Sequence, residues 1–421
     1  MLQPDRRPLR PFLSIALAMG LSPMTATGQE TPAPETEEVQ PVEHPGDVVV
    51  PEWKLRLLDV AYDAASAFPL HPHSKNRAKA QEVAVRAALE LRQPTRALRY
   101  TEGIENWRRG AGLAAYAYYC AEQGVDGPVA ALLAQADEIS RSSELTNDQE
   151  WRRERIQATI ARTHLLMGDT DKAAAVTASM ASAEAGVVEN QRARTVDVRA
   201  LEPHLARLEE IGAAGDFEQT KHALRTSAAF YARVYEDEEK REKIEDKVRS
   251  VWKRLPAEIR IEILTDLSAT AARHGDTEHA VALVDEGETV FAAVRWTLEH
   301  GLEVRSALAA ARHRAGDPKG AREKADEAFL DYQKGKDGIY DMFRADALLP
   351  LAEAYTEMEA DETAKGLYRM ALEEAVKNPN SRPRVEDLTA ILCSMALHDV
   401  EPTTGIWKQI EKAREGLGDP W

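Results

Sequence analysis

Three histidines near the start of the chain have the residue type and spacing that metal binding requires. His71 and His73 lie two positions apart across a proline in the segment FPLHPHSKN, and His44 precedes them. Imidazole nitrogens in an extended loop can ligate a metal ion. Single histidines in such loops are more often simply exposed. We therefore expect no metal site and no cofactor.

Local catalytic motifs are absent from the sequence. It contains no HExxH metalloprotease motif, no P-loop, no glycine-rich dinucleotide turn, no GxSxG elbow and no CxxC pair. An enzyme that used carboxylates from separate helices would leave no local motif, and 71 acidic residues are present. The sequence favours a non-catalytic protein and leaves a helical enzyme as the alternative.

Tryptophans and cysteines point to packing rather than to chemistry. Most tryptophans occur once per helical hairpin near the expected start of a helix, which favours packing between repeats over a ligand pocket: Trp53, Trp107, Trp151, Trp252, Trp296, Trp407 and Trp421. Cys120 and Cys393 lie among apolar neighbours. If each repeat touches only its neighbours, the two are too distant for a disulfide, so we expect two buried free thiols.

Composition predicts an all-α protein with little affinity for polyanions. Hydrophobic residues make up 43% of the 421 residues and aromatic residues only 6%, while alanine, leucine, glutamate and arginine supply amphipathic helices. The formal net charge is -17. Such a chain is repelled by nucleic acid and by anionic lipid, so neither is an expected partner.

The first 28 residues have the pattern of a signal peptide. Arg6, Arg7 and Arg10 precede an apolar core over residues 12–24, which is shorter than the ~20 residues that span a bilayer. We expect export to the periplasm or beyond the cell, with no stable membrane insertion after cleavage; an uncleaved anchor is the alternative. Residues 29–50 are rich in proline and glutamate and predict a disordered linker.

From residue 51 to residue 421 the apolar spacing is helical and is broken at regular intervals by tight turns. The turns fall at Gly124, Gly168-Asp169, Gly215-Asp216, Gly275-Asp276, Gly316-Asp317 and Glu359-Ala360. Glycine takes the left-handed conformation that ends one helix, and the following aspartate caps the next. This pattern predicts an array of antiparallel helical hairpins.

Four of the turns are followed by a small residue, at Ala173, Ala280, Ala321 and Ala364. The segment LPLAEAYTEMEADETAKGLYRMALEEA adds large, small and aromatic residues at regular places, namely Leu351, Ala352, Tyr355, Ala364, Tyr368 and Ala371. Over about residues 148–378 the chain thereby resembles the tetratricopeptide repeat family. The resemblance implies a right-handed α-solenoid, a TPR-like superhelix, although the units are longer than the family's ~34 residues.

The resemblance also implies a concave surface, lined by the first helix of each hairpin, that binds extended peptides or protein segments. Position by position it places eight residues on that surface: Arg155, Arg162, Arg273, Glu303, His313, Arg314, Asp346 and Glu353. Their charges are mixed and do not form the family's basic clamp for C-terminal carboxylates. Each of them is also compatible with a solvated surface that binds nothing.

Two further segments predict helices. Residues 235–255 combine i,i+4 ion pairs with a narrow apolar seam at Ile244, Val248, Val251 and Leu255, which favours a solvated helix on the array over a partner-binding helix. The segment TGIWKQIEKAREGL places Ile406, Ile410, Ala413 and Leu417 on one face. That face favours a cap on the last repeat over a contact between copies.

These observations favour one function and leave two alternatives. The favoured hypothesis is a non-catalytic scaffold of the cell envelope that binds a protein or peptide partner on the concave face. A helical-toroid carbohydrate-active enzyme, with carboxylates from different hairpins meeting in one groove, is the first alternative. A self-associating structural envelope protein is the second.

Overall fold

The computed structural model describes residues 44–142, 150–178, 180, 182–195, 201–215 and 217–418. All regular secondary structure in these residues is helical, and the predicted all-α class is confirmed. The signal peptide, residues 29–43 of the predicted linker, Asp216 and Trp421 lie outside the described residues. None of the described helices combines the length and apolar character needed to cross a bilayer.

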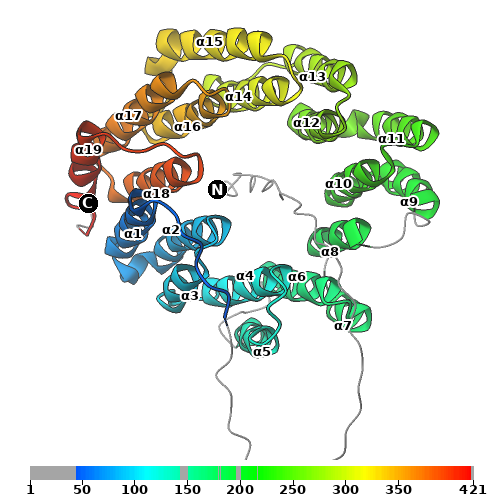
Figure 1. Ribbon diagram of the computed structural model, residues 1–421, viewed down its shortest axis with the longest axis horizontal. Helices are drawn as coiled ribbons and strands as arrows, with labels where there is room; N and C mark the ends of the chain where they lie inside the picture. Colours follow the sequence, from blue (N-terminus) through cyan, green and yellow to red (C-terminus); the bar gives the residue numbers. More distant parts are fainter. Residues whose placement is uncertain are drawn as a thin grey trace, which may run out of the picture. The chain divides into compact units, whose positions relative to one another are not determined.

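The described residues run through a succession of α-helices (Figure 1), and two short 3-10 helices lie among them. The first nine are α1 (Glu52–Ala67), α2 (Leu70–Glu90), α3 (Pro94–Glu102), α4 (Arg108–Glu122), α5 (Val129–Ser140), α6 (Glu150–Leu166), α7 (Thr170–Thr177), α8 (Ser182–Thr195) and α9 (Leu201–Ala214). They are followed by α10 (Phe217–Val234), α11 (Glu238–Val251), η3 (Trp252–Arg254), α12 (Ala257–Arg273), α13 (Thr277–Ala292), α14 (Leu298–Arg314), α15 (Pro318–Gly335), η4 (Lys336–Gly338), α16 (Asp341–Glu357), α17 (Asp361–Lys377), α18 (Ser381–Leu397) and α19 (Thr404–Arg414).

The predicted turns end helices as their residues require. Gly168, Gly275 and Gly316 all have positive φ, between 77° and 94°, where a side chain would be strained. Asp276 and Asp317 cap the helices that follow, accepting backbone N–H bonds at 3.2 and 2.9 Å. The cap predicted at Asp169 is wrong, because its side chain bonds Lys172 instead of a backbone N–H.

Small residues allow the two helices of a pair to approach closely. Ala173, Ala280, Ala321 and Ala364 are fully buried. Each lies in the first turn of the second helix of a packed pair: α6 with α7, α12 with α13, α14 with α15, and α16 with α17. A larger side chain at these positions would force the paired helices apart. The helical repeat fold is thus built on the small residues that the sequence singled out.

The even-numbered helices pack one after another, and the last of them, α18, packs against the first, α2. Each even-numbered helix from α2 to α16 packs against the next one, and α18 packs against α16 and also against α1 and α2 (Figure 1). Thr389 of α18 donates to the carbonyl of Ala61 in α1 at 3.5 Å, and Asn76 of α2 donates to Glu386 at 3.4 Å. The sequence did not predict this contact of α18 with α1 and α2.

The hydrophobic core reflects the same closure. One buried cluster combines residues of α1–α6 with residues of α14–α19, and a second covers α8–α14. Among the described residues, a smaller cluster around Val188 connects α6 with α8. The apolar contacts are therefore extensive at the seam between α18 and α1.

The two amphipathic segments lie within the array. The predicted helix at 235–255 forms α11 and η3; it buries Ile244 and Val248 against α9 and α10, and Lys243 and Lys247 pair with carboxylates of α9. Helix α19 packs on α17 and α18. It buries Ile406, Ile410 and Ala413, and Leu417 just beyond its end is buried as well, as expected for a cap.

Residues 44–50, which fall inside the predicted linker, have no regular secondary structure but contact the helices. His44 lies 3.1 Å from the hydroxyl of Tyr116, Asp47 accepts the backbone N–H of Thr95, and Val48 donates its backbone N–H to the carbonyl of Arg92. These contacts hold the segment on α3 and α4. The folded part of the described chain therefore starts before residue 51.

Candidate functional site

The eight residues predicted to face a partner all lie on even-numbered helices. Helix α6 carries the first two, α12 the third, α14 the next three and α16 the last two: Arg155, Arg162, Arg273, Glu303, His313, Arg314, Asp346 and Glu353. Because the even-numbered helices pack in one succession, these side chains belong to one continuous series of helices. The structure does not bring the eight together at a single point.

Several of them cross-link neighbouring helices. Arg314 of α14 pairs with Glu357 of α16, and Glu353 of α16 accepts a hydrogen bond from Ser394 of α18 at 2.9 Å. Arg273 is exposed and donates to Thr270 of its own helix. Arg314 and Glu353 thus serve contacts between helices, which the sequence could not distinguish from exposed binding positions.

A buried ion cluster lies where α2, α4 and α6 meet. Glu82 of α2 is only 6% exposed and pairs with three guanidinium groups: Arg86 at 2.6 Å, Arg108 of α4 and Arg155 of α6. Burial alone would raise the pKa of Glu82, but the charges of the three arginines hold it below its usual value. Among these four side chains, one negative charge faces three positive charges.

The excess positive charge acts on the arginines themselves. Burial lowers the pKa of Arg155 to about 10; Glu82 opposes this shift, while the like charges of Arg86 and Arg108 reinforce it. Arg108 is 7% exposed, and its Nε has no hydrogen-bond partner among the described residues. The cluster would therefore be stabilised by additional negative charge.

Aromatic rings extend the cluster along α4 and α6. The guanidinium of Arg162 lies 4.5 Å from the ring centroid of Tyr118. That of Arg152 lies 5.8 and 5.4 Å from the ring centroids of Trp107 and Trp151, which are themselves in edge contact. Such stacking orients a guanidinium without neutralising its charge. We call the five basic side chains the arginine face: Arg86, Arg108, Arg152, Arg155 and Arg162.

The sequence predicted only part of this cluster. Arg155 and Arg162 were singled out, whereas Glu82, Arg86, Arg108 and the stacked Tyr118 were not. The i,i+4 spacing of Glu82 and Arg86 was a signal for one pair. The contacts to Arg108 and Arg155 join residues 26 and 73 positions apart, and no local pattern predicts them.

A histidine bridges two of the even-numbered helices. Nε2 of His300 in α14 lies 3.2 Å from Glu258 of α12, and its Nδ1 lies 3.5 Å from Glu303. The hydrogen bonds to Glu258 and Glu303 raise the pKa of His300 to about 10. His300 is therefore protonated at neutral pH, and its bond fixes Glu303 within the array.

We expect the contribution of His300 to stability to disappear in alkaline solution. A raised folded-state pKa means that the contribution is complete below pH 6.5 and is lost as the pH rises towards 10. His300→Gln should lower the free energy of unfolding by about 0.5–1 kcal/mol at pH 6. Urea unfolding at pH 6 and pH 10.5 measures the difference between the two proteins; an equal difference at both pH values would contradict the expectation.

The histidines considered as metal ligands make separate contacts. His44 lies against Tyr116, and His73 packs on Phe68 with ring centroids 4.8 Å apart. In the described part of the chain, no group of three histidine, cysteine, aspartate or glutamate side chains is placed to hold a metal ion. The predicted free thiols Cys120 and Cys393 are confirmed as buried and unpaired.

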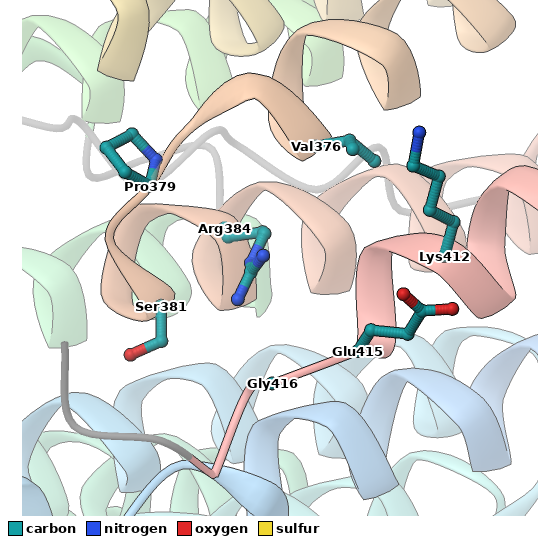
Figure 2. Close-up of a pocket in the computed structure, with 7 residues that line it drawn as sticks. All are labelled: Val376, Pro379, Ser381, Arg384, Lys412, Glu415 and Gly416. Carbon is teal, nitrogen blue, oxygen red and sulfur yellow. The ribbon is translucent and has the colours of Figure 1, made fainter.

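Two cavities near the C-terminal helices contain none of the predicted residues. Figure 2 shows the larger, of about 490 Å³, between the α17–α18 connection and the end of α19, lined by Val376, Pro379, Ser381, Arg384, Lys412, Glu415 and Gly416. The other, of about 340 Å³, lies between α1 and α19. Both adjoin α19, the helix that caps the array, and the larger also contacts the start of α18.

Comparisons with known proteins leave the family open. No family model matches the chain, and no curated protein matches it. One solved structure is described as a "Circular tandem repeat protein with novel repeat topology and enhanced subunit contact surfaces"; it is 15% identical, covers 87% of this chain and 94% of that chain, and superposes with a TM-score of 0.28. A TM-score this low carries no argument about fold or function.

Proposed function

We propose that this protein is a non-catalytic interaction scaffold of the cell envelope, exported by its signal peptide to the periplasm or beyond the cell. It binds a protein or peptide segment on the surface of its even-numbered helices, in the manner of a right-handed, TPR-like array of hairpins. One observation carries the proposal: all eight residues expected to face a partner lie on helices that pack in one continuous succession.

Affinity capture from envelope extract tests the proposal. The bait is residues 29–421, and the variant replaces Arg155, Arg162 and Arg314 with glutamine. A matched control replaces three exposed basic residues outside the even-numbered helices, Arg141, Lys319 and Arg369, and so removes the same charge. We expect a partner that the wild type and the control capture and the variant loses. Equal capture by all three proteins would refute the proposed surface.

A helical-toroid carbohydrate-active enzyme is the second candidate, because the succession of helices closes and brings carboxylates of distant helices together. Burial and the negative charge of Glu353 in α16 raise the pKa of Glu90 in α2, which is what a general acid requires. Release of reducing sugar from a panel of polysaccharides, lost in Glu353→Gln, would favour this candidate. No release from any of them would remove it.

A further inference from the structure

The charge of the arginine face differs from that of the whole chain. The formal net charge of the protein is -17, yet three guanidinium groups surround the single carboxylate of Glu82. Glu184 of α8 also acts on Arg155, and burial raises the pKa of Glu184. The surface formed by α2, α4 and α6 is therefore locally positive and attracts anions, although the protein as a whole is acidic.

Helix α6 presents its arginines in a row. Arg152, Arg155 and Arg162 are three and seven residues apart, and this spacing places them on one face of the helix. All three are partly exposed. In the described part of the chain no carboxylate pairs with Arg162, whose guanidinium is held by the ring of Tyr118.

The length of the row sets the size of a ligand. Ten residues of α-helix separate Arg152 from Arg162, a rise of about 15 Å. An extended peptide covers that distance with about four to five residues. A long polyanion would extend beyond the row onto the acidic remainder of the protein, whereas a short acidic segment would not.

We propose that the segment bound by this protein is acidic, and that its carboxylates lie along α6 between Arg152 and Arg162. This inference rests on the proposed scaffold function and names the chemistry of its partner. Guanidinium groups bind carboxylates through paired N–H bonds. The ring of Tyr118 and the exposed ring of Trp151, 48% of which is accessible, provide apolar contact beside those bonds.

A labelled pentaglutamate peptide with blocked ends tests the inference by fluorescence anisotropy with residues 29–421. We expect binding that weakens with salt, and a loss of about tenfold in affinity in Arg162→Gln, since one charge-assisted hydrogen bond is removed. Arg162→Lys keeps the charge but not the planar group, and should lose less. Arg369→Gln, an exposed arginine on α17 outside the proposed binding surface, is the matched control and should bind as the wild type does.

Two results would overturn the inference. One is equal binding of pentaglutamine or pentalysine; the other is unchanged binding of pentaglutamate by Arg162→Gln, once circular dichroism shows that the variant melts as the wild type does. Either result would leave the scaffold function standing if envelope capture still depended on the even-numbered helices. If the capture experiment found no partner but pentaglutamate still bound tightly, the result would count against the scaffold function and not against the acidic-ligand site.

Discussion

Replacing Glu82 with alanine is expected to lower the free energy of unfolding by about 3–5 kcal/mol, because removal of one partner leaves buried opposite charges uncompensated. In the wild type this carboxylate contacts Arg86, Arg108 and Arg155. Without it, three guanidinium groups repel one another where α2, α4 and α6 meet. Urea unfolding followed by circular dichroism at neutral pH measures the loss.

A second substitution and an exposed control show whether the loss of stability in Glu82→Ala comes from uncompensated charge or from lost packing. Adding Arg108→Leu to Glu82→Ala removes one of the uncompensated charges and should restore part of the lost stability. Glu323→Gln removes a carboxylate that is 63% exposed and 3.8 Å from Lys319, and should change the free energy of unfolding by less than about 0.5 kcal/mol. If Glu82→Ala lowered the free energy of unfolding no more than this control does, the ion cluster would contribute no more to stability than an exposed ion pair.

Leu392→Ala should destabilise the protein by about 2–5 kcal/mol, as expected for a cavity in a packed core. Leu392 is fully buried in α18 and lies one helical turn from Thr389, which bonds to Ala61 of α1. Since α18 packs on both α16 and α1, we expect faster amide hydrogen exchange in α1 and α2 as well as in α16 and α17.

The exchange pattern tests the closure of the helix succession directly. In an open array the effect of Leu392→Ala would spread to α16 and α17 and leave α1 and α2 protected, because each repeat would touch only its sequence neighbours. Leu330→Ala on α15, where the side chain is 47% exposed, provides a control that should alter neither pair of helices. Unchanged protection of α1 and α2 in Leu392→Ala would contradict the closed succession.

Local features of the fold were predictable because their causes are local. Gly275 and Gly316 end helices through positive φ, and Asp276 and Asp317 cap the helices that follow. Ala280 is buried in the close contact of paired helices, as its size and position indicated. These residues act on neighbours within a few positions, so their spacing in the sequence carries the information.

The closure and the arginine face were not predictable for the opposite reason. At the seam Thr389 bonds to the carbonyl of Ala61, 328 positions away. No pattern in the sequence near either residue predicts this contact. The same holds for Arg155, which was predicted to face a partner and whose contact with Glu82 on α2 was not foreseen. Polar residues on a helix surface give the same pattern whether they bind a partner or a neighbouring helix.

The seam between α18 and α1 also determines when the fold can be completed. A ribosome that adds about 5–20 residues per second needs roughly 20 to 60 s to travel from Ala61 to Thr389. Throughout that interval the nascent α1 has Leu57 and Leu58 in place but not the helix that later covers its remaining face. The part of α1 that α18 covers therefore stays without its partner until nearly the whole chain has been made.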